Sequence, residues 1–287
     1  MKHVERAPAK INLSLRVLRR REDGFHEVET LMVALGGLHD VISLDLVEGP
    51  GGISLSCDDP GLPVDEDNLV NRAVQVFSSV TGREFTGNIV LEKRIPSGAG
   101  LGGGSSDAAA ALRGMNKLSG ASLSDAKLCV MAAEIGADVA FFVSSRPSVC
   151  TGKGELVTPY AGKIAERQVL LVKPGFSVAT AWAYSQWEGS EQLPGVDYSP
   201  QPSPWGELRN DLERPVFAKH LVLAAMKSWL LDQSGVEFAM MSGSGSTLFA
   251  ILRQGEAAES LRERALSEFG SSSWAACARI GQSGSGC

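Results

Sequence analysis

The amino-acid sequence predicts an α+β protein of two domains that share a cleft. The chain has 287 residues, which is long for a single compact domain. In its first half, strand and helix patterns follow one another irregularly instead of in regular βαβ repeats. A new series of strand and helix patterns begins beyond about residue 157. We therefore expect an N-terminal domain over residues 1–157 and a C-terminal domain over residues 158–287.

The segment from residue 10 to residue 17 alternates strictly between polar and apolar side chains. Successive side chains of a strand point to opposite faces of the sheet, so this period predicts a half-buried strand with one polar face. The apolar face carries Ile11, Leu13, Leu15 and Val17, and the polar face carries Lys10, Asn12, Ser14 and Arg16.

Similar patterns predict the remaining elements. Alternation over residues 42–46 and 53–57, on either side of Gly49–Gly52, indicates two antiparallel strands joined by a turn. Asn68 is placed to cap a helix, and a strand over residues 88–95 precedes a helix that begins near Ser105. In the second half we expect strands at residues 168–172, 247–252 and 275–280, and helices at residues 216–231 and 257–269.

The composition excludes several classes of protein. A formal net charge of −6 argues against broad binding to nucleic acid, which depends on Lys and Arg neutralising phosphates. The N-terminus lacks the apolar stretch of a signal peptide, and no apolar run approaches the ~20 residues that span a membrane. The five cysteines are scattered and form no Cys-x-x-Cys or Cys/His metal spacing. We expect a reduced cytoplasmic protein without a protein-built metal site, and the oligomeric state is left open.

The strongest local signal is a glycine- and serine-rich segment between a strand and an alanine-rich helix. Its glycines permit positive φ and close approach of the backbone to a ligand. The start of the following helix directs free N–H groups and the positive end of its dipole at one place, which suits an anion such as a phosphate. The candidate residues are Pro96, Ser97, Gly98, Ala99, Gly100, Leu101, Gly102, Gly103, Gly104, Ser105 and Ser106.

Three other interpretations of this segment are weaker. A flexible linker would not be set so tightly between a strand and a helix. The spacing Gly98-x-Gly100-x-x-Gly103 matches a dinucleotide-binding fingerprint, but the preceding strand is charged and ends in Pro96, unlike a buried Rossmann strand. The P-loop pattern Gly-x-x-x-x-Gly-Lys-[Ser/Thr] does not occur in the sequence.

Three separated motifs together resemble the GHMP kinase superfamily, which contains the kinases of galactose, homoserine, mevalonate and phosphomevalonate. The motifs are Pro8–Asn12, Pro96–Ser106 and Ser242–Ser246. The resemblance extends in order over nearly the whole chain. It implies an N-terminal domain of the ribosomal protein S5 domain 2-like fold, a ferredoxin-like α+β C-terminal domain, and an active site between them.

Further signatures resemble the branch of the superfamily that phosphorylates a cytidyl diphospho-methylerythritol in the non-mevalonate isoprenoid pathway. They are Asp23–His26, Glu66–Leu69, Gly136–Val139, Gly152–Glu155 and Asn210–Glu213. The implied reaction transfers the γ-phosphoryl group of ATP to the 2-hydroxyl of the acceptor, giving the 2-phosphate and ADP. This chain departs from the family at three positions, where Asp107 replaces the common Asn, Ala99 a frequent Gly and Phe25 a frequent Tyr.

The resemblance also assigns a catalytic pair. Taken alone, Asp138 is a turn or capping carboxylate and Lys10 a surface charge on a strand. The resemblance makes Asp138 the base that accepts the proton of the attacking hydroxyl, and Lys10 its partner. ATP is the co-substrate and Mg²⁺ is expected with it, held largely by phosphates and water. Nothing in the sequence distinguishes Asp107 or Glu134 from helix-cap and surface carboxylates as metal ligands.

The remaining candidate residues concern the acceptor. Asn12 lies on the face of Lys10 and is expected to hydrogen-bond the polyol. The resemblance places Phe25 against the cytosine and His26 at its edge, and Tyr184 is either the opposite aromatic face or a plain core residue. The loop with Gly243, Ser244 and Gly245 is either a clamp on substrate phosphates through backbone N–H groups or a tight turn before a strand.

Two other functional classes are compatible with parts of the sequence. Another GHMP kinase, acting on mevalonate or a related alcohol, would have no cytosine for Phe25 and His26 to recognise. An RNA- or nucleotide-binding module would share the N-terminal fold, but the acidic balance of the chain counts against it.

Overall fold

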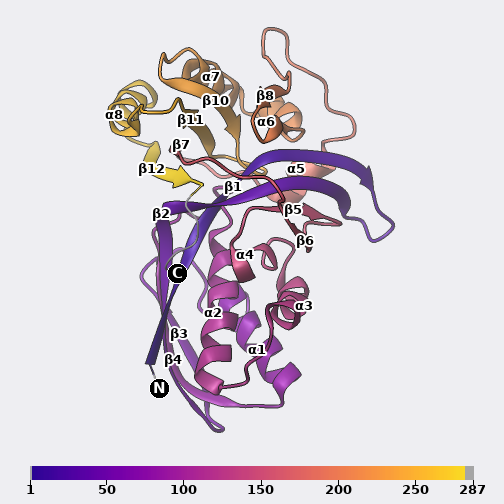
Figure 1. Cartoon of the computed structure of the whole chain (residues 1–287), viewed down its shortest axis with the longest axis vertical. Helices are drawn as coiled ribbons and strands as arrows, with labels where there is room; N and C mark the ends of the chain where they lie inside the picture. The colour runs from indigo at the N-terminus through magenta and orange to yellow at the C-terminus, as the bar shows by residue number, and fades with distance from the viewer. Residues whose placement is uncertain (1, 282–287) are drawn as a thin grey trace.

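A long antiparallel ribbon of two strands runs through the middle of the molecule (Figure 1). The structure is a computed structural model that describes residues 2–281. The ribbon strands β1 (Lys2–Arg20) and β2 (His26–Glu48) are paired along most of their length. One end of the ribbon belongs to the helical half drawn at the bottom of Figure 1, and the other crosses under the second half. Residues from both halves therefore meet along the ribbon.

The first half packs helices on one face of a sheet. Strand β4 (Phe85–Glu92) pairs with β2, and β3 (Gly52–Cys57) lies outside β4. Helices α1 (Leu69–Thr81), α2 (Gly103–Ser119), α3 (Asp125–Ile135) and α4 (Phe141–Ser144) cover this sheet. The short strands β5 (Ser148–Thr151) and β6 (Leu156–Pro159) extend the other end of β2. The expected cap is present, since the Asn68 side chain accepts a hydrogen bond from the Val70 N–H.

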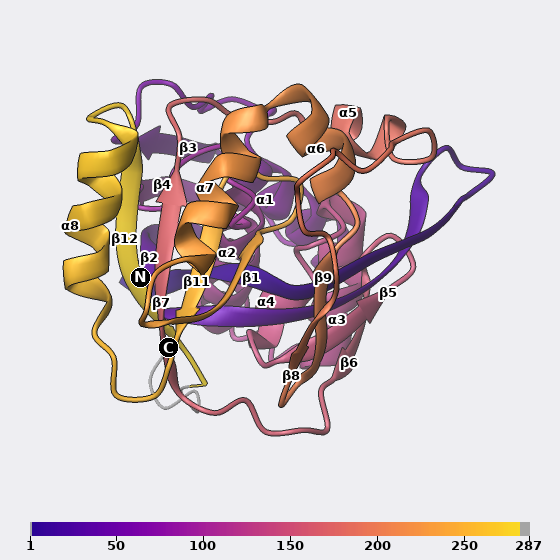
Figure 2. The same ribbon diagram turned by 90° about the horizontal axis from the view of Figure 1, so that it is seen from above.

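The second half contains an antiparallel sheet in the order β10–β11–β7–β12. Its strands are β7 (Arg167–Lys173), β10 (Val236–Met241), β11 (Leu248–Leu252) and β12 (Trp274–Ile280). Helices α7 (Leu221–Leu231) and α8 (Ala258–Phe269) lie side by side on this sheet (Figure 2). The connecting elements are α5 (Thr180–Ser185), β8 (Gln201–Ser203), β9 (Gly206–Asn210) and α6 (Glu213–Lys219).

The two halves share part of their core. One hydrophobic cluster lies under α1, α2 and α3, and a second under α7 and α8. A third cluster joins apolar residues of β1 and β2, among them Ile11 and Val33, to residues of the other sheet such as Leu171 and Phe249. The predicted α+β class is confirmed. The proposed boundary between residues 157 and 158 falls inside β6, which pairs with β5 of the first half.

The sequence-based prediction for residues 10–17 is wrong in one respect. Lys10 and Asn12, on the expected polar face, are each only 3% exposed. The reason is that this face of β1 is covered by the two glycine-rich loops and by the start of α2, while the other face packs on the C-terminal sheet. A buried lysine and asparagine beside a cavity are a stronger sign of function than a solvated polar face.

Two other predictions about the elements are corrected. Strand β3 does not pair with β2, because β4 lies between them; β3 runs parallel to β4 and β4 antiparallel to β2. Alternation predicts that a strand exists but not which strand lies beside it. The helix expected over residues 216–231 is divided at His220, whose φ of −123° and ψ of 74° are not helical. Strand β10 was not predicted.

Candidate active site

A cavity of about 1010 Å³ lies between the two halves of the chain. Its wall includes residues of β1, of the glycine-rich segment before α2, of the turn after α3, of α5 and of the loop before β11. Every predicted site residue lines it except Ser106 and Gly245. Ser106 is fully buried in the first turn of α2, and its hydroxyl has no hydrogen-bond partner within residues 2–281.

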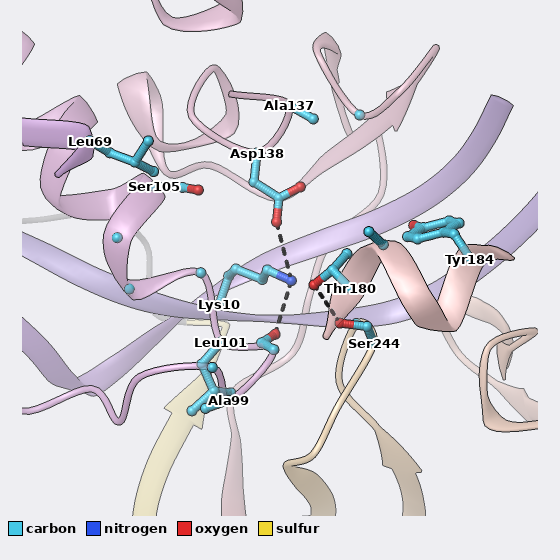
Figure 3. Close-up of a pocket in the computed structure, with 18 of the residues that line it drawn as sticks. Lys10, Leu69, Ala99, Leu101, Ser105, Ala137, Asp138, Thr180, Tyr184 and Ser244 are labelled. Carbon is cyan, nitrogen blue, oxygen red and sulfur yellow. Dashed lines mark hydrogen bonds and ion pairs between the residues drawn. The ribbon is translucent and has the colours of Figure 1, made fainter. Parts of the chain in front are cut away.

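The centre of the cavity holds Lys10 and Asp138, whose side chains point toward one another in Figure 3. The Nζ atom of Lys10 lies 3.5 Å from Oδ2 of Asp138 and donates hydrogen bonds to Asn12 Oδ1 at 2.7 Å and to the Gly100 carbonyl at 3.1 Å. Lys10 is 3% exposed and Asp138 34% exposed. The ammonium is therefore fixed by three acceptors, while the carboxylate keeps one side open to a ligand.

Local structure explains why each of these two residues is presented. Lys10 is at a register shift in the β1–β2 pairing, and its backbone N–H is bonded to Leu101 rather than to β2. This contact holds the glycine-rich segment against β1. Asp138 follows the end of α3 at Gly136, in a turn that the Val139 N–H closes onto the Gly136 carbonyl. A turn between two helices leaves the carboxylate free to face the cavity.

Asn12 extends the polar line along β1. Its side-chain amide donates to Thr30 Oγ1 at 2.8 Å, and the Thr30 hydroxyl donates to the Ser14 carbonyl at 2.6 Å. The oxygen of the Asn12 amide is thereby turned to Lys10. Both Asn12 and Thr30 line the cavity, so the position predicted for Asn12 next to Lys10 is the one that the structure shows.

The glycine-rich segment supplies a bent backbone at the start of α2. Gly98, Gly100 and Gly102 all have positive φ, of 59°, 74° and 72°. Gly102 is the N-cap of α2, and a Cβ at this position would lie 2.8 Å from Cζ of Phe142 and 3.1 Å from Cγ of Lys10. The first backbone N–H groups of the 17-residue helix α2 thus face the cavity, where an anion is favoured.

The loop between β10 and β11 is in direct contact with this segment. A Cβ on Gly100 would lie 2.2 Å from the Ser242 carbonyl oxygen, and the Ser242 hydroxyl donates to the Gly100 carbonyl at 2.9 Å. Gly243 lies against Lys10 and Asn12, and the hydroxyl of Ser244 is 2.9 Å from that of Thr180. The two glycine-rich loops therefore form one wall of the cavity, although they are about 140 residues apart in the sequence.

Aromatic side chains, among them Phe25, His26 and Tyr184, line another part of the cavity wall. The imidazole of His26 stacks on Tyr184, with ring centroids 5.5 Å apart and an interplanar angle of 27°. Phe25 is 57% exposed, and Lys153 Nζ lies 4.8 Å from the centre of its ring. Burial, with a smaller contribution from Arg20, lowers the pKa of His26. Since His26 and Tyr184 are stacked on one another, they do not form the two sides of an open slot.

A buried charge cluster lies behind the glycine-rich segment. Lys93 Nζ contacts Asp40 Oδ2 and lies 2.6 Å from Asp107 Oδ2, and Asp40 Oδ1 accepts from the backbone N–H groups of Arg94 and Ile95. Burial raises the pKa of Asp107 to about 7, against the opposing effect of Lys93. Lys93 and Asp107 line the cavity, so the charge state of this cluster acts on any anion bound there.

Several cavity residues were not predicted from the sequence, and the contacts of three of them bear on the site. Thr180 is bonded to Ser244, Lys153 lies over Phe25, and Lys93 is paired with two carboxylates. Lys153 stands in the segment Gly152–Glu155, where a lysine between two glycines was a usable signal. Nothing in the sequence marked Thr180, because its role depends on a loop 64 residues away. Within the described part of the chain, no group of three or more His, Cys, Asp or Glu side chains could hold a metal ion.

Comparisons with known proteins agree with this geometry. The family described as "GHMP kinases N terminal domain" matches residues 68–146, and "GHMP kinases C terminal" matches residues 201–272. A 4-diphosphocytidyl-2-C-methyl-D-erythritol kinase from Methylacidiphilum infernorum (isolate V4) is 41% identical over 247 residues, covering 85% of this chain and 84% of that protein. One from Solidesulfovibrio magneticus is 39% identical over 264 residues, or 88% of each chain.

A solved structure extends the comparison to the fold. The crystal structure of a 4-(cytidine 5'-diphospho)-2C-methyl-D-erythritol kinase aligns over 99% of this chain and 100% of that one, with a TM-score of 0.75 and 31% identity. The fold and the cavity therefore define this chain as a GHMP kinase. Within that superfamily it belongs to the family of the 4-diphosphocytidyl-2-C-methyl-D-erythritol kinases. The dinucleotide-binding and RNA-binding interpretations are set aside.

Proposed function

We propose that the chain transfers the γ-phosphoryl group of ATP to the 2-hydroxyl of 4-diphosphocytidyl-2-C-methyl-D-erythritol. The products are the 2-phosphate of that compound and ADP, and the reaction belongs to the non-mevalonate route to isoprenoid precursors. The observation that supports this reaction best is the Lys10–Asp138 pair, 3.5 Å apart, between a phosphate-binding backbone and an aromatic pocket.

Asp138 is the proposed general base. Its carboxylate would accept the proton of the acceptor hydroxyl as the hydroxyl oxygen forms a bond to the γ-phosphorus and the bond from that phosphorus to the bridging oxygen of ADP breaks. Lys10, fixed by Asn12 and Gly100, would hold Asp138 in place and stabilise negative charge on the transferring oxygens. Because the ammonium is already ordered, little reorganisation is needed during the reaction.

The phosphates of ATP are proposed to lie on residues 96–106. Gly100 and Gly102 allow the backbone to approach them closely, and the start of α2 adds its N–H groups and dipole. Gly243 and Ser244, packed beside Gly100 and Lys10, are placed to bind acceptor phosphates through their backbone N–H groups.

Magnesium is proposed to arrive with the nucleotide. No cluster of three ligating side chains is present within residues 2–281, and near Lys10 the cavity offers the partly exposed carboxylate of Asp138. That donor set fits a cation held mostly by phosphate oxygens and water. When bound, Mg²⁺ would neutralise charge on the phosphates.

Recognition of the cytosine is assigned to the aromatic part of the cavity wall. We propose that the base stacks on Phe25 and that neutral His26 bonds its edge. A neutral imidazole carries one donor and one acceptor nitrogen, which suits the mixed edge of cytosine.

No helix within residues 2–281 is both long enough and apolar enough to cross a membrane. The cytoplasmic location predicted from the sequence remains a proposal.

One assay tests the assignment. The purified protein is given Mg-ATP with the cytidyl diphospho-methylerythritol, mevalonate or homoserine, and ADP release is measured. We expect turnover with the cytidyl compound alone. Turnover with mevalonate or homoserine and none with the cytidyl compound would contradict the proposal.

A further inference from the structure

A second cavity, of about 370 Å³, lies beside the short parallel pairing of β1 with β9. It shares no lining residue with the large cavity. Its wall combines the end of β1, the loop after α5, and the segment between β9 and α6. Among its lining residues are Arg16, Trp187, Tyr198, Arg209, Asp211 and Arg214.

Three buried polar atoms of this cavity have no hydrogen-bond partner in the described part of the chain. They are Nε1 of Trp187, the hydroxyl oxygen of Tyr198 and Nε of Arg214. Seven buried side-chain atoms within residues 2–281 lack a partner, and three of the seven belong to residues that line this one small space. Native proteins leave few such atoms unpaired. All three groups carry a hydrogen to donate, so what they lack is an acceptor.

The charge of the cavity is positive. Three arginines line it, against the single carboxylate of Asp211. Both oxygens of that carboxylate are already used, by Nε and Nη2 of Arg209 at 3.2 and 2.7 Å and by the Val17 N–H at 2.9 Å. Arg16 has only an exposed pair with Glu29 at 3.3 Å. This excess of positive charge occurs in a chain whose net charge is −6.

The small cavity and the large cavity are linked by two aromatic rings in contact, those of Trp187 and His26. The indole of Trp187 meets the imidazole of His26 edge-on, with centroids 6.0 Å apart and an interplanar angle of 80°. His26 lines the large cavity and Trp187 lines the small one. A ligand bound to Nε1 of Trp187 is therefore in contact with a ring that packs on the proposed base-recognition residue.

We propose that this second cavity binds a small oxyanion of the phosphate class. Guanidinium groups bind phosphate through charge-assisted hydrogen bonds, and the Trp187 N–H and Tyr198 O–H would complete the set of donors. The chemistry fits either a free phosphate or diphosphate, or the diphosphate of the acceptor entering from the large cavity. Because the two cavities share no lining residue, the ligand is the free ion.

The indole N–H of Trp187 gives a direct test. The ¹⁵N-labelled protein, with its ATP site filled by a non-hydrolysable ATP analogue, is titrated with inorganic phosphate and with pyrophosphate at constant ionic strength. The Trp187 signal is assigned from Trp187→Phe. We expect it to move saturably while the other indole signals stay in place, and chloride alone to leave it unmoved. A Trp187 signal that phosphate does not move would overturn the proposal.

Variants identify the residues that hold the ion. Arg214→Gln removes the unpaired guanidinium and should weaken phosphate binding at least about ten-fold, since a bond to a charged group is lost. Tyr198→Phe removes one donor without a change of charge and should weaken binding less. Arg262→Gln, on α8 and outside the cavity, removes the same charge and should leave binding unchanged. If Arg214→Gln and Arg262→Gln weakened phosphate binding equally, the effect would come from the net charge of the protein. That result would contradict a specific site in this cavity.

A last arm separates the two sources of the oxyanion. The phosphate titration is repeated with saturating cytidine 5'-diphosphate, which carries the base and diphosphate of the acceptor. An unchanged midpoint of the Trp187 shift supports a separate site for the free ion. Loss of the phosphate response would show that the acceptor diphosphate occupies this space and would overturn the assignment. Well-dispersed spectra of each variant establish that it is folded.

Discussion

The Nζ atom of Lys10 lies 3.5 Å from Oδ2 of Asp138 and is held on its other side by the Gly100 carbonyl and Asn12 Oδ1. These contacts join three parts of the chain that are far apart in the sequence. The ammonium is nearly sealed from solvent and the carboxylate is a third exposed. One member of the pair is thus fixed while the other is open, as a base that receives a proton from a bound alcohol must be.

Replacing Asp138 by asparagine tests the base. The amide keeps the size of the side chain but cannot accept a proton as the carboxylate does, so kcat should fall by about 10²- to 10⁴-fold. The affinity for ATP should stay within a factor of about two, because the proposed phosphate-binding segment at residues 96–106 is untouched. Steady-state kinetics and direct ATP binding measure the two effects.

Asp125→Asn is the matched control, since this exposed aspartate in the first turn of α3 makes the same change outside the cavity. It should keep the wild-type kcat. If Asp138→Asn kept the wild-type kcat, Asp138 would not be the general base.

The glycine-rich segment was predictable from the sequence, and the position of its charged neighbour was not. The five glycines, the strand before them and the helix after them are local signals. From the sequence, Lys93 was interpreted only as part of the charged strand before Pro96. The structure buries it, which is possible only because Asp40 and Asp107, 53 and 14 residues away, converge on its ammonium. Burial of a charge depends on partners that local sequence patterns do not specify.

The same limit applies to the fold. The alternation that predicted β3 is correct, yet its neighbour is β4, since pairing depends on how strands are arranged around a shared core. Strand β10 was missed because Val236–Met241 is a short, nearly continuous apolar run, and such a run does not separate a buried strand from a helix segment. For Asp138, the residues alone indicated a capping aspartate. Only the packing of α3 and α4 on α2, which itself packs against β1, brings it to Lys10.

Gly100→Ala should damage the contact between the two glycine-rich loops. The added Cβ would lie 2.2 Å from the Ser242 carbonyl oxygen and 2.9 Å from that of Gly245, at a φ of 74° that side chains rarely adopt. The backbone must shift, and with it the carbonyl that holds Lys10. We expect kcat/KM for ATP to fall at least about ten-fold, because a misplaced catalytic group of this kind costs up to ~10²-fold.

Gly120→Ala separates the steric effect from the cost of the left-handed backbone. Gly120 ends α2 with a φ of 63°, and its Cβ would meet nothing within 4 Å. This variant should lose about 1 kcal/mol of stability and keep its activity. If both variants showed the same kinetics as the wild type, the loop contact would have no part in catalysis.

Asp107→Asn should change how stability depends on pH. Burial raises the pKa of Asp107 to about 7, above the ~3.9 of an unfolded aspartate. The folded state therefore holds its proton through this range, and the stability present below pH 4 is lost as the pH rises toward 7. One such group changes the slope of the free energy of unfolding by at most about 1.4 kcal/mol per pH unit. Asparagine should flatten the decline, as denaturant unfolding between pH 5 and 8 would measure.

The control is Asp232→Asn, at the exposed C-cap of α7, which should leave the pH profile unchanged. If the free energy of unfolding of Asp107→Asn depended on pH as in the wild type, Asp107 would be ionised throughout this range. Asp40 and Asp107 would then share the single positive charge of Lys93.

His26 should make the KM for the cytidyl acceptor depend on pH, while the KM for ATP stays constant. Burial, followed by the nearby charge of Arg20, lowers the pKa of His26 below its usual ~6.5. The imidazole is then neutral at pH 8 and stays neutral down to that usual value. Protonation at lower pH removes its acceptor nitrogen, so KM for the acceptor should be flat above pH 6.5 and rise below it.

His26→Asn should raise that KM at every pH and abolish the rise. His39→Asn is the matched control, because burial also lowers the pKa of His39 but this side chain lies outside the cavity. If the rise in acceptor KM persisted in His26→Asn and disappeared in His39→Asn, the titrating group would be His39, which contradicts the prediction.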